Sequence, residues 1–154
     1  MVTGEAQIID KNTVRCGEET YNAENLILCT GSETFIPPIT GVETVNYWTH
    51  RDALDSKELP ASLAIVGGGA TGIELAGALA EMRKFVLPQD YPDLNINEMR
   101  IILLDGSSRL LSAFSEESSK EVADYLKKRD VEIKLNQRVM GYENYQLALN
   151  DGTA

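Results

Sequence analysis

The chain has 154 residues, of which 43% are hydrophobic and 25% charged, a composition typical of a globular protein rather than a disordered or fibrous one. Fourteen basic and twenty-four acidic side chains give a net charge of −10, which disfavours binding to nucleic acid and to anionic membrane surfaces. No apolar run approaches the ~20 residues of a membrane span, and we find no signal peptide, so we expect a cytoplasmic protein.

The first thirty residues are expected to form short strands. Apolar runs bounded by polar turns predict three of them, over residues 6–10, 13–16 and 25–31. Cys29, within the third run, is interpreted as a small buried hydrophobe, with a redox role as the alternative. The spacing of the two cysteines fits neither a metal site nor a redox pair.

An extended connector and a short helix follow these strands. Pro37 and Pro38 disfavour a helix and cannot donate to a strand, so the chain around them is expected to be extended. The run 49–59 then predicts a short helix, with Thr49 or Asp52 as its N-terminal cap.

The remaining residues alternate between strand and helix patterns. Apolar runs of strand length predict four strands, over residues 62–68, 100–105, 131–136 and 145–149. Two helices with apolar faces are predicted over residues 71–85 and 116–130, the second capped by Ser115. This order predicts an α/β fold, a Rossmann-like parallel sheet with crossover helices that is preceded by short β-strands.

A glycine motif joins the strand over 62–68 to the following helix. Gly67, Gly69 and Gly72 have the spacing Gly-x-Gly-x-x-Gly, which allows a sharp turn, close approach of a pyrophosphate and close helix packing, respectively. A bare tight turn is the alternative, but the flanking strand and buried helix favour a dinucleotide site at the helix N-terminus. The expected cofactor-binding residues of this turn are Gly67, Gly68, Gly69, Ala70, Thr71 and Gly72.

The acid that would bind the ribose hydroxyls is expected at the end of the next strand. Because polar residues are inserted between Lys84 and Met99, that acid is Asp105 rather than one about 20 residues after the glycines. A carboxylate there accepts hydrogen bonds from the ribose and repels a 2′-phosphate, so the sequence favours NAD(H). Arg109 could instead serve a phosphate, or it could be a solvated or salt-bridged surface residue.

Glu74 has two interpretations. An acid in the first turn of a helix is favoured by the helix dipole alone, and the alternative is a role near the nicotinamide. The single histidine, His50, has no acid or nucleophile beside it and is interpreted as structural. We identify no catalytic residue and no metal site.

Four segments together resemble the FAD-dependent pyridine nucleotide–disulfide oxidoreductases, in particular dihydrolipoamide dehydrogenase-like members. They are "AENLILCTGSETFIPPITGVE", "ELPASLAIVGGGATGIELAGALA", "DGSSRLL" and "SKEVADYLKKRDVEIKLNQRV". The resemblance implies that Cys29, Thr30 and Gly31 match the family's Ala-Thr-Gly element, with Thr30 and Gly31 at the FAD. It also implies that Glu74 lies near the nicotinamide and flavin, and that Asp105 binds the ribose.

The resemblance also implies a domain organisation. Residues 1–31 would be the C-terminal tail of an FAD-binding domain, 32–57 a connector, and 58–154 an NAD(P)H-binding domain truncated at its C-terminus. The family's first glycine motif, its redox cysteine pair and its interface domain are absent. We therefore expect a fragment that is inactive alone and whose partners are a dinucleotide, the rest of the parent flavoprotein and, through an exposed sheet edge, a second copy of itself.

Two other functions remain open. The insertion "RKFVLPQDYPDLNINEMR" is more similar to type II NADH dehydrogenases, which pass electrons from NADH through FAD to quinone and would imply a peripheral membrane location. A non-catalytic NAD-sensing module is the other alternative.

Overall fold

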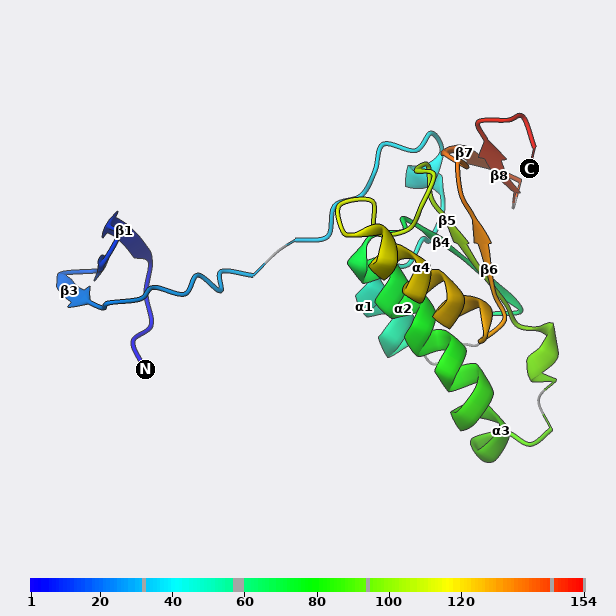
Figure 1. Cartoon of the computed structure of the whole chain (residues 1–154), viewed down its shortest axis with the longest axis horizontal. Coiled ribbons are helices and arrows are strands. Elements are labelled where there is room, and N and C mark those ends of the chain that lie inside the picture. Colours follow the sequence, from blue (N-terminus) through cyan, green and yellow to red (C-terminus); the bar gives the residue numbers. More distant parts are fainter. Residues whose placement is uncertain (32, 57–59, 94, 145, 154) are drawn as a thin grey trace. The chain divides into compact units, whose positions relative to one another are not determined.

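The computed structural model describes residues 1–31, 33–56, 60–93, 95–144 and 146–153. It contains two compact units, Met1–Phe35 and Ile36–Ala154, which are described separately. The first unit holds an antiparallel sheet in the order β1-β2-β3, formed by β1 (Ala6–Asp10), β2 (Thr13–Cys16) and β3 (Glu19–Asn22) (Figure 1). The first two strands are those that the sequence predicts.

The third strand differs from the prediction. Residues 25–31 form no strand and are exposed, including Cys29, whose expected burial is therefore wrong. The physical reason is the short connection after β2. Cys16 pairs with Glu19 across a two-residue turn in which Gly17 adopts φ +62°, so strand pairing resumes immediately in a polar run.

The second unit is built on a parallel sheet in the order β4-β5-β6, formed by β4 (Ser62–Val66), β5 (Arg100–Leu104) and β6 (Val131–Lys134). Helix α2 (Ala70–Glu81) connects β4 to β5, α4 (Glu116–Lys127) connects β5 to β6, and both lie on one side of the sheet (Figure 1). Helices and strands share one apolar core, which includes Ile65, Ala76, Leu79, Ile101, Leu103 and Leu126. The predicted α/β class, with a Rossmann-like parallel sheet, is confirmed.

Two helices begin at the residues that the sequence marks as caps. α1 (His50–Asp55) follows Thr49, whose hydroxyl accepts a hydrogen bond from the Asp52 amide while the Asp52 carboxylate accepts one from the Thr49 amide. Ser115 caps α4 through its hydroxyl. The expected continuation of α1 over residues 57–59 lies outside the described part of the chain.

Helix α2 extends further than predicted. It continues through a π-helical turn, η2 (Met82–Val86), into α3 (Leu87–Asp90), beyond the expected end at residue 85. The wider π turn ends two residues before Pro88, which has no amide hydrogen, and the helix continues across this missing hydrogen bond. A short 3₁₀ helix, η3 (Ile96–Glu98), then leads to β5.

Arg83, within the π turn, ties the helix to two loops. Its guanidinium donates hydrogen bonds to the carbonyl oxygens of Met99 (2.8 Å), Arg129 (2.6 Å) and Asp130 (3.3 Å). We expect Arg83→Met to lower the free energy of unfolding by about 2 kcal/mol, because these acceptors lose a charged donor. Urea unfolding followed by circular dichroism measures this, with Lys84→Met, an exposed side chain on the same turn, as the control. Equal effects of the two changes would contradict the role given to Arg83.

A hairpin and the connector pack against the carboxyl end of β5. The hairpin strands are β7 (Val139–Glu143), which the sequence does not predict, and β8 (Gln146–Leu149), which it does; the predicted first residue of β8, Tyr145, lies outside the described residues. In the connector, Ile39 packs against a small cluster of Leu104, Val139 and Leu149 and precedes the 3₁₀ helix η1 (Val42–Thr44). No described helix is long and apolar enough to cross a membrane.

Candidate functional site

The turn between β4 and α2 is fixed to the neighbouring strand by hydrogen bonds. Gly67 follows β4 with φ +117°, a conformation that favours glycine, and its amide donates to the Leu104 carbonyl oxygen at 2.9 Å. The buried Gly68 donates to Asp105 Oδ2 at 2.5 Å, and its carbonyl oxygen accepts from the Leu111 amide at 2.9 Å. The turn therefore keeps one conformation relative to the carboxyl end of β5.

The glycines of this turn are required for different reasons. A Cβ atom on Gly72 would overlap the carbonyl oxygen of Gly67, so glycine lets α2 pack closely on the turn. A Cβ on Gly68 would lie 2.7 Å from Leu110 Cδ2. In contrast, a Cβ on the exposed Gly69 would meet no atom within 4 Å. The turn thus leaves open space at Gly69, the position at which the sequence predicts a pyrophosphate.

The N-terminus of α2 presents hydrogen-bond donors to this space. In the described part of the chain, the amides of Gly69, Ala70 and Thr71 have no protein acceptor, and all three residues are exposed. Free amides at the start of a twelve-residue helix, together with the helix dipole, favour the binding of an anion at this end of α2. Glu74 is exposed but is the fifth residue of α2, so it lies beyond the first turn, in which the dipole would by itself favour an acid.

Asp105 follows β5 directly, and its carboxylate contacts the glycine turn. Oδ2 accepts the amide of Gly68 at 2.5 Å, and Oδ1 accepts the amide of Ser107 at 2.6 Å. Partial burial acts to raise the pKa of this carboxyl, but the hydrogen bonds from Gly68 and Ser107 outweigh it and hold the pKa below its ordinary value of 3.8. Asp105 is therefore an anion at neutral pH, with lone pairs left for a further donor such as a ribose hydroxyl.

The lowered pKa values make stability depend on pH. Because the folded-state pKa of Asp105 lies below the unfolded value, its contribution is complete above pH 3.8 and is lost as the pH falls through the folded value. The same sign holds for Asp52 and Asp151, whose pKa values are lowered by hydrogen bonds from Thr49 and Thr153, in the case of Asp151 to about 2. We expect the thermal unfolding midpoint to be constant between about pH 5 and pH 7 and to fall between about pH 4 and pH 2. Asp105→Asn should reduce this fall in the unfolding midpoint. A fall of the same size in the variant would contradict the stabilising role assigned to the ionised Asp105 carboxylate.

A cavity of about 430 Å³ lies at the carboxyl ends of β4 and β5. Gly67 and Asp105, which directly follow β4 and β5, line it together with Arg138 from the segment before β7 and with Pro37 and Pro38 from the connector. The predicted glycine turn and the predicted acid therefore border one cavity. The contributions of the connector and of Arg138 are not evident from the glycine motif, because they depend on how the hairpin packs on β5.

Arg109, the arginine weighed as a phosphate ligand, has another role. Its guanidinium donates hydrogen bonds to the carbonyl oxygens of Ser112 (2.8 Å), Phe114 (3.0 Å) and Ser115 (3.3 Å). It therefore holds the loop before α4 and is neither simply solvated nor salt-bridged.

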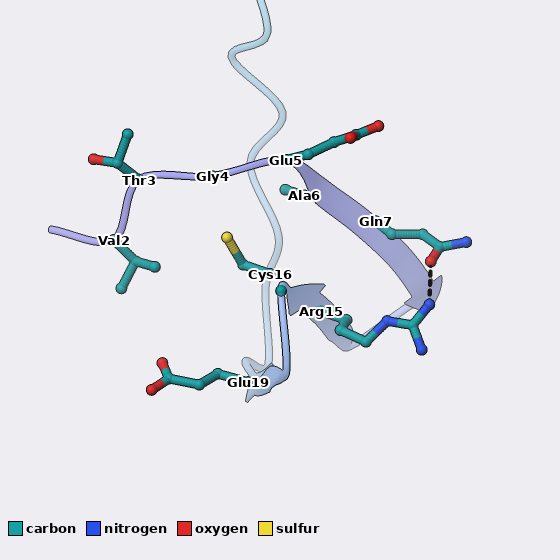
Figure 2. A pocket seen from close by; sticks show the side chains of 10 residues that line it. Val2, Thr3, Gly4, Glu5, Ala6, Gln7, Arg15, Cys16 and Glu19 are labelled. Atoms are coloured by element: carbon teal, nitrogen blue, oxygen red, sulfur yellow. Dashed lines mark hydrogen bonds between the residues drawn. The ribbon is translucent and has the colours of Figure 1, made fainter.

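The first unit contains the two remaining predicted residues, Thr30 and Gly31, in exposed chain after β3. This unit also has a broad pocket of about 820 Å³ beside β1 and β2 (Figure 2). Its polar lining includes Gln7 and Arg15, which are hydrogen-bonded to each other, and Cys16. Among the described residues of both units, no group of histidine, cysteine or acidic side chains could hold a metal ion.

A parallel sheet whose strand enters a buried helix through Gly-x-Gly-x-x-Gly, with an acid after the next strand, defines a Rossmann-like protein of the dinucleotide-binding class. More specifically, the chain belongs to the pyridine nucleotide-disulphide oxidoreductase family, whose sequence model matches residues 1–154. A dihydrolipoyl dehydrogenase of Geobacillus stearothermophilus is 31% identical in an alignment of 153 residues that covers 93% of this chain.

Two solved structures show the same fold. RclA from Escherichia coli, described as an HOCl-induced flavoprotein disulfide reductase, matches 96% of this chain with a TM-score of 0.59 and 25% identity. NDH2 from Plasmodium falciparum, solved with NADH, matches 77% with a TM-score of 0.60 and 19% identity, which supports the fold alone. The chain spans 28% of the dehydrogenase, 31% of RclA and 28% of NDH2.

Proposed function

We propose that residues 58–154 bind NADH and position it for hydride transfer to or from FAD in a flavoprotein oxidoreductase similar to dihydrolipoyl dehydrogenase. Residues 1–31 are assigned to the tail of the FAD-binding domain, and 32–57 to the connector. The whole protein is then an enzyme with NAD(H) and FAD as cofactors, and this chain alone binds NADH without turnover. Family membership and the name of the 31% identical relative support this assignment.

One observation carries the proposal. The Gly68–Asp105 hydrogen bond of 2.5 Å holds the turn before α2 next to an ionised carboxylate. The free amides of Gly69, Ala70 and Thr71 suit the two phosphates, and the open space at Gly69 lets them approach. An anion-binding helix N-terminus beside a ribose-binding acid matches the adenosine diphosphate half of a pyridine dinucleotide.

The residues of this chain would bind and orient the dinucleotide, while the nicotinamide, when bound, supplies the hydride. The first turn of α2 would hold the pyrophosphate, and Asp105 would fix the ribose and disfavour a 2′-phosphate. Glu74, which is exposed on the next turn of α2, is proposed to lie toward the nicotinamide. Thr30 and Gly31 are proposed to contact FAD in the whole protein.

Calorimetric titration of the chain with NADH, NADPH and FAD tests this function. We expect NADH to bind more tightly than NADPH, and FAD not to bind, because the described residues of the first unit contain no second glycine turn of this kind. Absence of binding by NADH would overturn the proposal for this chain.

A second candidate function is the NADH-binding part of a type II NADH:quinone oxidoreductase. The observation in its favour is the elaborated connection from α2 to β5, with a π turn, α3 and η3. In the whole protein, NADH-dependent reduction of a lipoamide-type disulfide would support the first candidate, and reduction of a soluble quinone analogue the second. NADH binding with neither reaction would indicate a nucleotide-sensing module.

We also propose that the chain self-associates. In the described sheet, β4 pairs with β5 alone, so its other edge is free, and Ala64 and Val66 are exposed on one face. Open edges of this kind pair with other chains. Sedimentation velocity should show dimers or larger species, which Ala64→Lys should reduce. A monomer at all concentrations would contradict the proposal.

A further inference from the structure

We infer that Arg138 sets the tolerance of this chain for a 2′-phosphate on the adenosine ribose, and therefore its selectivity between NADH and NADPH. The inference rests on the proposed dinucleotide function. It concerns an arginine that follows β6, on the hairpin side of the cavity, rather than one that follows β5.

The backbone of Arg138 is held in place beside the end of β5. Its amide donates to Asn150 Oδ1 at 2.7 Å, and its carbonyl oxygen accepts the Asn150 amide at 3.0 Å. The preceding residue, Gln137, donates its amide to the Asp105 carbonyl oxygen at 3.0 Å and its side-chain amide to Asp151 Oδ2 at 2.8 Å. Arg138 is thus bonded directly to Asn150, after β8, and its neighbour Gln137 is bonded to the residue that would bind the ribose.

The side chain of Arg138 extends along Gly106, the residue after Asp105. A Cβ atom built on Gly106 would lie 3.7 Å from both Cβ and Nε of Arg138, so the arginine side chain passes within van der Waals reach of this position. Arg138, Gly106 and Asp105 all line the 430 Å³ cavity. The arginine therefore borders the space in which the ribose of a dinucleotide would lie.

The charge of Arg138 is available to a ligand. Among the described residues, its guanidinium makes no hydrogen bond and no ion pair, although it lines the same cavity as the Asp105 carboxylate. Arg109, by comparison, is occupied by three backbone carbonyl oxygens within 3.3 Å. Arg138 is thus a free cation in the proposed site.

The two charges would act on a 2′-phosphate in opposite directions. Asp105 repels it and accepts a hydrogen bond only from an unmodified hydroxyl, whereas an arginine binds a phosphate through charge-assisted hydrogen bonds. NADH carries no 2′-phosphate and gains little from Arg138. The ratio of the two dissociation constants therefore depends on Arg138, while NADH affinity alone does not.

The test compares Kd values of NADH and NADPH for the wild-type chain, Arg138→Gln and Arg138→Lys. Loss of one charge-assisted contact should raise the Kd of NADPH about tenfold in Arg138→Gln and leave that of NADH within about twofold. Arg138→Lys keeps the charge and should retain most of the NADPH affinity. Arg100→Gln removes an arginine at the opposite end of β5 and should leave the ratio unchanged. Adenosine 2′,5′-bisphosphate, used as a competitor, should lose affinity in Arg138→Gln by about the same factor as NADPH.

Three results would overturn the inference without overturning NADH binding by the wild-type chain. The first is that Arg138→Gln leaves both Kd values unchanged, and the second is that it weakens both nucleotides equally, which would indicate a contact to the pyrophosphate. The third is a wild-type chain with no measurable affinity for NADPH. Binding of neither nucleotide by the wild type would instead overturn the proposed function itself, and the inference with it. Thermal unfolding of each variant checks that it is folded.

Discussion

The Gly72→Ala variant is expected to lose about 2–3 kcal/mol of the free energy of unfolding and to lose NADH binding, because overpacking against a rigid neighbour has a cost of this size. The added Cβ would overlap the carbonyl oxygen of Gly67, a backbone atom that cannot rotate away. Relief of this overlap moves α2 away from β4 and displaces the free amides at its N-terminus. Urea unfolding and NADH titration measure the two effects.

Gly69→Ala is the matched control for this change. The same methyl group, added three positions earlier, meets no protein atom within 4 Å, and Gly69 has φ −79°, which alanine adopts readily. The free energy of unfolding should change by less than about 1 kcal/mol, since the substitution alters only the N-cap residue of α2 and adds no steric overlap. NADH affinity should still fall, because the methyl group occupies the proposed phosphate space. Equal destabilisation by both substitutions would contradict the separate roles assigned to the two glycines.

Asp105→Asn is expected to weaken NADH binding by about 30-fold, the effect of losing a charged hydrogen-bond acceptor worth about 2 kcal/mol. NADPH should be weakened less, because the same change removes the repulsion of the 2′-phosphate. Asparagine is a better choice than alanine, since its side-chain oxygen can still accept the amide of the buried Gly68. Titration with both nucleotides measures the change in their ratio.

Asp124→Asn, on the exposed surface of α4, removes the same charge away from the cavity and should leave both affinities unchanged. If Asp105→Asn behaves like this control, Asp105 does not bind the ribose. The dinucleotide would then be held by the helix N-terminus alone.

The parts of the fold that local sequence determines were predictable. The parallel strands are continuous apolar runs, and Asp105 directly follows one of them. Thr49 and Ser115 cap their helices because a hydroxyl oxygen can accept a hydrogen bond from a free amide of the first helical turn. Gly67 and Gly72 could be assigned because a positive φ and a close helix contact leave few other residue types possible.

The remaining features depend on contacts between segments distant in sequence. β3 is polar and forms because Gly17 reverses the chain directly after β2, whereas the more apolar run 25–31 pairs with no described strand. The cavity wall at Arg138 exists because β7 and β8 pack on Leu104. Neither arrangement leaves a periodic pattern in the residues that form it.

The measurement that tests the proposed function most directly is an NMR titration of the ¹⁵N-labelled chain with NAD⁺, followed through backbone amide shifts. NAD⁺ binding at the glycine turn predicts the largest changes at Gly68, Gly69, Ala70 and Thr71, and at Gly106 and Ser107 beside Asp105. Smaller changes are expected in β1 to β3. Changes confined to the first unit, or no change at millimolar NAD⁺, would contradict the proposal that this turn binds a pyridine dinucleotide.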